Sequence, residues 1–379
     1  MSAVPLGGLV RGFRLVAGLT LEALAARSGV SVRAISDIER GKSLEPQSRT
    51  VRALADALEV SDADRTALYE AARPSAAEAP PLCLLPADLP DFTGRAAELA
   101  TLDELMRPGA TVVVCGPSGM GKTALAVHAA HGACDRFPGG RLFADLEGLD
   151  TALALSRLLR ACGVQPAAIP SALEDRADLL RQTLAERPRL LVLDNAEDEA
   201  RIRPLLPGDG VTTVVITSWW PLAGLTSATR VRLRPFGDAD AVAMLRAVTH
   251  ATSLVGDDAA LREVARLCGN YPLALRIAGS RLTSRPGWTA ATLAERLADP
   301  ARRLDRLVAG DLRVRDAFDA TCARLSPASH AALEALARDE PVDAVDALDE
   351  LAEAGLVIGR HLHDLLRLYL LTPPSPRPA

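Results

Sequence analysis

The feature that most constrains the fold of this chain is the glycine-rich segment Gly-Pro-Ser-Gly-Met-Gly-Lys-Thr at residues 116–123. It matches G-x-x-x-x-G-K-[ST] and lies between a β-branched run (111–115) and a helical stretch (122–131). Glycines let such a loop curl so that its backbone N–H groups point at phosphate oxygens, and the helix N-terminus adds partial positive charge. The segment predicts a site for a purine nucleoside diphosphate or triphosphate; the alternative is an ordinary glycine-rich turn.

Lysine usage supports a special role for one side chain of this loop. Only Lys42 and Lys122 are lysines among 43 basic residues, so a position that keeps lysine indicates a need for a compact ammonium group. We expect Lys122 to contact the β- and γ-phosphates and Thr123 to bind Mg²⁺ through its hydroxyl. The loop residues expected to contact the nucleotide are Gly116, Ser118, Gly119, Met120, Gly121, Lys122, Thr123 and Ala124.

Strand-like and helical runs alternate around this loop, which predicts a parallel α/β sheet. The further strand-like runs are 141–145, 190–193, 211–216 and 230–233. After Pro235 the pattern becomes helical, with runs at 238–248, 257–267, 272–282 and 314–371.

An acidic residue, Asp194, directly follows the apolar run 190–193. We expect this strand to neighbour the loop strand, so that Asp194 and Thr123 hold Mg²⁺ and Lys122 and Asp194 are the catalytic candidates. Alternatively, Asp194 only caps the next helix. Asn195 stands where many ATPases have a second carboxylate, and an amide cannot act as a general base, so we expect at most slow ATP hydrolysis.

The net charge of −5 hides an asymmetry. Residues 1–52 contain eight basic and four acidic side chains, a local charge of +4 that predicts phosphate affinity at the N-terminus. The six cysteines are scattered, which predicts neither zinc nor a disulfide framework. No apolar run is long enough for a membrane span, so we expect a cytoplasmic protein without a membrane partner.

Residues 6–73 have the pattern of short helices. Thr20 and Ser31 are suited to cap two helices that end at Gly29 and Gly41, as in a helix-turn-helix that binds double-stranded DNA. The start of the second helix would enter the major groove. We expect Val32, Arg33, Ser36 and Asp37 to meet base edges and Arg11, Arg14, Lys42 and Arg49 to meet phosphates. The alternative is a helical bundle that contacts only proteins.

Together these motifs resemble the bacterial NB-ARC regulators of the STAND class, which have an N-terminal XRE-type helix-turn-helix. The resemblance covers residues 6–369 and includes further motifs: Asp-Phe-Thr-Gly-Arg (91–95), Phe-Pro-Gly-Gly (137–140), Leu-Asp-Asn-Ala (193–196), Gly-Asn-Tyr-Pro-Leu-Ala-Leu (269–275) and Leu-His-Asp (362–364). It implies a multidomain α and α/β fold. The implied parts are a helix-turn-helix domain (1–73), a Pro/Ala-rich linker (74–90), a P-loop domain (91–235), a helical domain (236–310), an abridged winged-helix-like domain (311–371) and a disordered tail (372–379).

The resemblance also implies roles for single residues. Phe92 and Thr93 would lie beside the adenosine, Pro272 would pack on the base, and His363 would touch the β-phosphate of ADP. Alternatively, Pro272 only starts a helix and His363 is a solvated side chain. Trp219 stands where the family has an arginine that senses the γ-phosphate, and an indole cannot pair with a phosphate charge.

The predicted function is a transcriptional regulator whose DNA binding is coupled to ADP and ATP, with self-association on activation. Two alternatives stay open. One is an ATPase effector whose N-terminal domain binds protein, and the other is an ADP-locked regulator controlled by a partner.

Overall fold

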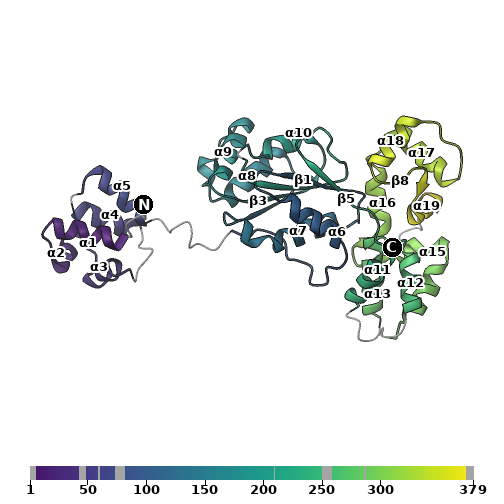
Figure 1. The fold of residues 1–379 in the computed structure, drawn as a ribbon, viewed down its shortest axis with the longest axis horizontal. Helices are drawn as coiled ribbons and strands as arrows, with labels where there is room; N and C mark the ends of the chain where they lie inside the picture. Colours follow the sequence, from purple (N-terminus) through teal and green to yellow (C-terminus); the bar gives the residue numbers. More distant parts are fainter. Residues whose placement is uncertain are drawn as a thin grey trace. The chain divides into compact units, whose positions relative to one another are not determined.

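The computed structural model describes residues 6–41, 48–58, 60–72, 82–208, 210–249, 258–285 and 287–372. The chain forms two compact units, residues 1–80 and 81–379 (Figure 1). Residues 373–379, expected to be a disordered tail, lie outside the described residues.

The first unit consists of short helices around one hydrophobic core. Thr20 accepts a hydrogen bond from the Ala23 N–H, and Ser31 accepts one from the Ala34 N–H, so two of the helices start where the sequence predicted. The helices are α1 (Leu6–Val16), α2 (Leu21–Ser28), α3 (Val32–Glu39), α4 (Ser48–Ala57) and α5 (Asp62–Ala72). Leu24, Ile35, Ile38, Leu54 and Leu68 fill the core.

Close packing of α1 on α3 depends on a glycine. A Cβ atom on Gly7 would fall 2.4 Å from the carbonyl oxygen of Ile38 and 3.0 Å from that of Glu39. Because backbone atoms cannot move aside cheaply, only glycine permits this approach.

The second unit begins with a five-stranded parallel sheet in the order β2-β3-β4-β1-β5. The strands are β1 (Thr111–Cys115), β2 (Arg141–Asp145), β3 (Leu190–Ala196), β4 (Thr213–Ser218) and β5 (Thr229–Arg232). The first two have the predicted bounds, and the others begin or end a few residues away from them. The parallel α/β fold predicted from the alternating pattern is therefore confirmed.

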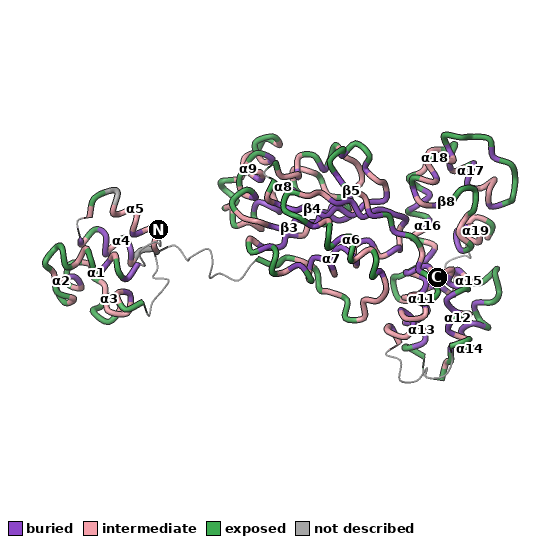
Figure 2. The backbone as a smooth tube through the Cα atoms, in the orientation of Figure 1, coloured by how far each residue is buried: buried purple, intermediate pink, exposed green. Residues whose placement is uncertain are grey.

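Helices cover both faces of this sheet (Figure 1). On one face lie α6 (Ala96–Leu105) and α7 (Lys122–Gly132), and on the other lie α8 (Thr151–Ala161), α9 (Leu173–Ala185) and α10 (Glu199–Ile202). Successive strand residues point to opposite faces, so Val112 and Val114 join one core while Val113 and Cys115 join the other. Both faces are apolar, and Figure 2 shows the central strands buried, whereas the edge strand β5 is partly exposed.

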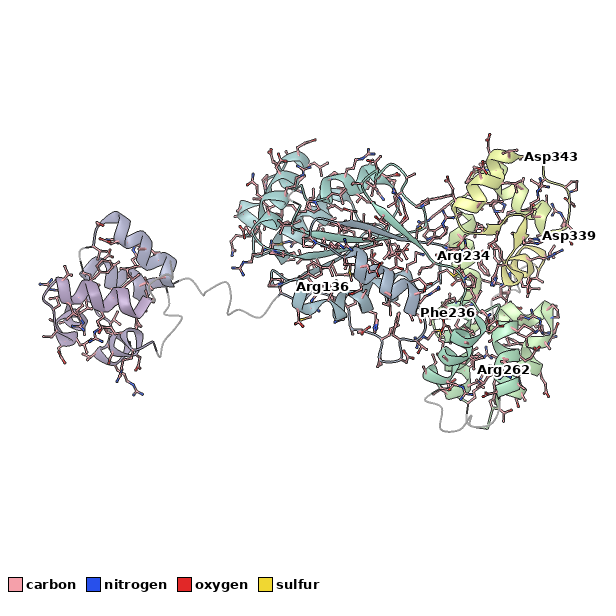
Figure 3. The ribbon with its side chains drawn as sticks, in the orientation of Figure 1. Arg136, Arg234, Phe236, Arg262, Asp339 and Asp343 are labelled. Atoms are coloured by element: carbon pink, nitrogen blue, oxygen red, sulfur yellow. The ribbon has the colours of Figure 1, made fainter. Side chains whose placement is uncertain are left out.

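Beyond β5 the chain passes Arg234 and Phe236 and enters a helical region (Figure 3). Its helices are α11 (Asp238–Val248), α12 (Asp258–Leu267), α13 (Pro272–Thr283), α14 (Ala290–Ala298) and α15 (Pro300–Arg306). A short hairpin of β6 (Val308–Ala309) and β7 (Leu312–Arg313) follows. Short 3₁₀ helices span Cys134–Arg136, Pro166–Ala168 and Arg203–Leu205.

The segment 314–371, expected to be helical, contains a second hairpin. Its elements are α16 (Val314–Cys322), α17 (Pro327–Ala337), α18 (Val345–Glu353), β8 (Val357–Ile358), β9 (His361–Leu362) and α19 (Asp364–Leu371). Ser326 caps α17 with Pro327 in its first turn, and Gly355 and Gly359 adopt φ of 72° and 64°, which ends α18 and turns the hairpin.

The expected linker also differs from the structure. Residues 82–84 pair with the edge of the sheet, because the Arg141 N–H donates to the Leu82 carbonyl and the Leu84 N–H to the Arg141 carbonyl. Backbone pairing thus extends the second unit N-terminally into the segment expected to be linker. Within the described residues, no helix combines the length and the apolar character that a membrane crossing requires.

Candidate functional site

The loop between β1 and α7 has the backbone that its glycines predict. Gly116, Gly119 and Gly121 adopt φ of 147°, 79° and 83°. Lys122 opens α7 and is buried, and its ammonium group donates to the Pro117 carbonyl at 3.0 Å. Burial lowers the pKa of Lys122 to about 8. A phosphate bound at this loop would supply a negative charge, which would stabilise the buried ammonium group in its charged form.

Thr123 and Asp194 lie together, as expected, but β1, the strand that leads into the loop, is not adjacent to β3, the strand that carries Asp194. The Thr123 hydroxyl donates to the Asp194 carboxylate at 2.8 Å, and β4 lies between β1 and β3. The chain order of the strands differs from their order in the sheet, and the sequence does not reveal this. Thr217 at the end of β4 also donates to Asp194. Burial raises the pKa of Asp194, although both hydroxyls oppose that shift.

A second carboxylate at this edge was missed by sequence reasoning. Asp145 ends β2 in register with Asp194, and the Asn195 amide donates to Asp145 at 2.9 Å and to Asp194 at 3.3 Å. The signal in the sequence was the same as for Asp194, namely an acidic residue that closes an apolar strand. Hydroxyl and carboxylate oxygens are the ligands that Mg²⁺ prefers, so this edge has the chemistry of a magnesium site.

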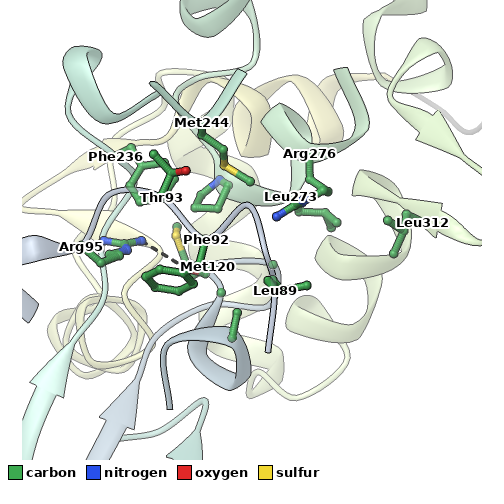
Figure 4. Close-up of a pocket in the computed structure, with 14 residues that line it drawn as sticks. Leu89, Phe92, Thr93, Arg95, Met120, Phe236, Met244, Leu273, Arg276 and Leu312 are labelled. Atoms are coloured by element: carbon green, nitrogen blue, oxygen red, sulfur yellow. Dashed lines mark hydrogen bonds between the residues drawn. The ribbon is translucent and has the colours of Figure 1, made fainter. Parts of the chain in front are cut away.

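A cavity of about 250 Å³ opens beside the loop (Figure 4). It is mostly apolar, as expected of a nucleobase site. Its lining includes seven of the residues predicted to bind nucleotide: Phe92, Thr93, Gly119, Met120, Gly121, Ala124 and Pro272. Pro272 is also the first residue of α13, so a place in the cavity lining and a structural role at the helix start are compatible.

The entrance segment (residues 91–95) is fixed by contacts that the sequence did not indicate. The Phe92 ring stacks on His128 of α7, with centroids 4.0 Å apart and planes 7° from parallel. His128 in turn contacts the Asp88 carboxylate at 3.0 Å. Arg276, which lines the cavity, donates to Asp91.

The loop is also held by the helical region. The Leu273 N–H donates to the Gly119 carbonyl at 3.1 Å, and the Tyr271 hydroxyl donates to the Ser118 carbonyl. Arg95 donates to the carbonyls of Met120 at 3.2 Å and Arg234 at 2.7 Å. The cavity therefore joins three segments that are distant in sequence: the entrance segment, the loop and the start of α13.

In the first unit, α3 presents part of the predicted DNA-contacting set to solvent. Val32 and Arg33 are exposed, whereas Ser36 and Asp37 are half-buried, and Asp37 lies 3.3 Å from Arg40 and 4.0 Å from Arg33. Arg40, also exposed, was not among the candidates.

One predicted phosphate contact is wrong. The Arg14 side chain is 12% exposed and donates twice to Glu39, at 2.6 and 2.8 Å, so it joins α1 to α3. Arg11 is exposed. Lys42 lies outside the described residues, and for Arg49 only its place in α4 is described.

Known proteins resemble this chain in both units. A family model described as a helix-turn-helix domain matches residues 5–68. The regulatory protein AfsR of Streptomyces griseus is 39% identical over 336 residues, covering 79% of this chain and 34% of AfsR. AfsR of Streptomyces coelicolor is 37% identical over 321 residues, covering 75% of this chain and 32% of that protein. The chain thus spans about a third of the length of these curated relatives.

Among solved structures, the Walker-type ATPase PABY2304 of Pyrococcus abyssi matches with a TM-score of 0.52 and 14% identity, over 75% of this chain and 97% of that chain. The likeness concerns the fold. The chain therefore has a helix-turn-helix domain in its first unit and is similar to bacterial regulatory proteins over about three quarters of its length. At this level the resemblance predicted from the sequence is confirmed.

His363 does not line the cavity beside the loop. It lines a second cavity of about 150 Å³ together with Pro117, Met120 and Tyr271. Its Nδ1 accepts from the Leu365 N–H at 3.2 Å, so its Nε2–H donates to the Gly269 carbonyl at 2.7 Å. Both nitrogens are thus engaged, and a phosphate contact would have to replace one of these bonds.

The position after β4 holds Trp219, which is buried. Arg230 of β5 is the arginine that follows Trp219 in the chain, and it donates to the carbonyls of Pro221, Ala228, Leu222 and Leu225. All three of its nitrogens are used by the backbone, so Arg230 has a structural role.

Proposed function

We propose that this protein is a DNA-binding transcriptional regulator whose activity is coupled to ADP or ATP, with Mg²⁺, at the loop 116–123. The observation that supports this most is the continuity of the loop with the 250 Å³ apolar cavity in a chain that also has a helix-turn-helix domain. The glycine backbone and Lys122 suit the phosphates, and the cavity suits the base.

Residue roles follow from the contacts. Phe92, stacked on one face by His128, would offer its other face to the base. Thr123 and Asp194 would bind Mg²⁺ on the phosphate side, with Asp145 nearby. Bound Mg²⁺ would neutralise charge on the phosphates.

The coupling would use the winged-helix-like region (residues 311–371). Gly355 of this region packs closely on Pro117 of the loop, because a Cβ added to Gly355 would lie 3.1 Å from Pro117 Cδ. Arg232 of β5 also donates to the Ala352 carbonyl of this region. ADP would favour this closed arrangement, and exchange to ATP would favour an open one that self-associates. Such a switch requires that the two nucleotides differ in affinity for the two states.

The proposed DNA partner is double-stranded, with α3 in the major groove. The proposal includes the cytoplasmic location expected from the sequence, because a bacterial regulator that binds DNA must be in the compartment that contains the DNA. Hydrolysis would be slow, because Asn195 occupies the usual position of the second carboxylate.

The test begins by identifying the nucleotide released when the purified protein is denatured. Protection of DNA is then compared with ADP and with a non-hydrolysable ATP analogue, for the wild type and for Lys122→Ala. We expect protection to differ between the nucleotides in the wild type and not in Lys122→Ala. Arg262→Ala, an exposed arginine on α12, is the control and should behave as the wild type.

The two alternatives give different results. An ADP-locked regulator would release ADP and protect DNA identically in every arm. An ATPase effector would show appreciable turnover and protect no specific DNA sequence.

A further inference from the structure

The indole at the end of β4 is partnered by a cation from a distant part of the chain. In the sheet, β4 lies between β1, which leads into the loop, and β3, which ends at Asp194. Trp219, the next residue, is therefore at the carboxyl edge where phosphates and metal would bind. The guanidinium carbon of Arg324, on the turn between α16 and α17, lies 4.7 Å from the centre of the Trp219 ring.

Arg324 has hydrogen-bond donors to spare. One of its nitrogens lies 3.9 Å from a Glu197 oxygen, which is an ion pair too long for a hydrogen bond. Among the described residues, no hydrogen bond from the Arg324 guanidinium is present, and the side chain is 35% exposed. The indole holds the position of the group while leaving its N–H fork available.

The region that carries Arg324 also packs against the loop. This winged-helix-like region is in contact with the loop through Gly355 and Pro117. Arg324 and Lys122 thus belong to two parts of the chain that are in contact, and a ligand with dense negative charge would suit both cations.

We propose that Arg324 contacts the terminal phosphate of a nucleoside triphosphate and is the residue by which the site distinguishes it from a diphosphate. This inference rests on the proposed function, which it deepens. Trp219 has no charge to pair with a phosphate and acts as the platform that positions Arg324. A γ-phosphate would draw the guanidinium away from Glu197, and the turn after α16 would move with it. The winged-helix-like region would thereby respond to whether a nucleoside triphosphate or a diphosphate is bound.

The experiment measures the affinities of fluorescent ADP and of a fluorescent non-hydrolysable ATP analogue, with Mg²⁺, for the full chain. The variants are Arg324→Ala, Arg324→Lys and Trp219→Phe. Arg338→Ala is the control, an exposed arginine of the same region next to Asp339, which Figure 3 shows at the outer edge. Circular dichroism checks that each variant is folded.

We expect Arg324→Ala to weaken binding of the ATP analogue by roughly 10-fold or more, as loss of a charge-assisted hydrogen bond would, with ADP affinity within about 2-fold. Arg324→Lys should lie in between, since it keeps the charge and loses the planar fork. Trp219→Phe should reduce the preference for the triphosphate less than Arg324→Ala, and Arg338→Ala should leave it unchanged.

Equal weakening of both nucleotides in folded Arg324→Ala, or weakening of neither, would overturn this inference and leave the proposed function standing. If the wild type bound neither nucleotide, the proposed function would fall and this inference with it. Lys122→Ala distinguishes failure of this inference from failure of the proposed function. If the wild type binds both nucleotides and Lys122→Ala binds neither, the proposed function stands whatever the result for Arg324→Ala.

Discussion

Gly119 shows how strongly one residue of the loop is constrained. Its φ of 79° is in the left-handed region, and a Cβ there would lie 2.9 Å from both Leu273 Cβ and Tyr271 Cε1. Gly119→Ala should therefore lower the free energy of unfolding by about 1–3 kcal/mol and weaken nucleotide binding. Chemical denaturation and nucleotide titration measure the two effects.

A matched control lies on the following helix. A Cβ on Gly132, at the end of α7, meets no described heavy atom within 4 Å, and no left-handed φ is required there. Gly132→Ala should be neutral or stabilise by up to about 1 kcal/mol. Equal losses in both variants would show that the Gly119 conformation is not the cause.

His363 gives the fold a dependence on pH. Burial lowers its pKa below the ordinary 6.5, and its Nδ1 must stay unprotonated to accept the Leu365 N–H at the start of α19. The unfolded chain then binds more protons than the folded one just below pH 6.5, so this contribution to stability is lost as pH falls through that range.

The measurement is the melting temperature between about pH 5 and 7.5 for the wild type and His363→Asn, whose side chain does not titrate. Asparagine keeps an acceptor for the helix cap and a donor for Gly269. We expect a shallower loss of stability on acidification in His363→Asn. Parallel curves would count against His363 as the titrating group.

At the scale of the elements, α1 and α3 contain two arginines that we expect to have different roles, one in the stability of the unit and one in DNA binding. The Arg14 pair with Glu39 is mostly buried, whereas the Arg33 side chain is 94% exposed. Arg14→Ala should destabilise the first unit by about 2 kcal/mol, since it leaves Glu39 without its hydrogen-bonding partner. Arg33→Ala should leave stability unchanged and weaken binding of specific DNA by about 10-fold.

Melting curves and DNA titrations of the two variants check this difference. A melting temperature lowered by Arg33→Ala, or DNA binding weakened by Arg14→Ala at a temperature where the variant is fully folded, would contradict the assignment. The helix explains the difference, because residues three or four apart share a face: Ile35 and Glu39 lie on the side of α3 that faces the core and α1, whereas Arg33 lies on the open side.

At the scale of the whole molecule, the two units have separate cores. Leu24, Ile35 and Leu54 belong to one core, whereas the sheet and the helical region have their own. We expect two unfolding transitions on heating. ADP with Mg²⁺ should stabilise the unit of residues 81–379, by about 2.7 kcal/mol at 100 times Kd, and leave the other transition in place.

Differential scanning calorimetry with and without ADP, and with Lys122→Ala, tests this. The control is DNA carrying a protected sequence, which should raise the transition of residues 1–80. A single transition that shifts as a whole with ADP would show that the two units unfold cooperatively.

The sequence by itself determined the elements and the chemistry of the loop. The bounds of β1 and β2, the caps at Thr20 and Ser31 and the start of α7 all follow from signals within a few residues, because periodicity, capping and glycine conformations are local. The resemblance added Phe92, Thr93 and Pro272, which the structure places in the cavity lining, and His363, which it places in a second cavity.

Tertiary structure alone decided which distant residues meet. Thr123 and Asp194 are 71 residues apart. The sequence did not reveal that β4 lies between β1, which leads into the loop, and β3, which carries Asp194. The burial of Arg14, the place of Asp145 and the stacking of Arg324 on Trp219 likewise depend on how the chain packs. The physical reason is that a side chain's neighbours across a sheet or between domains are set by the path of the whole chain, which no local pattern encodes.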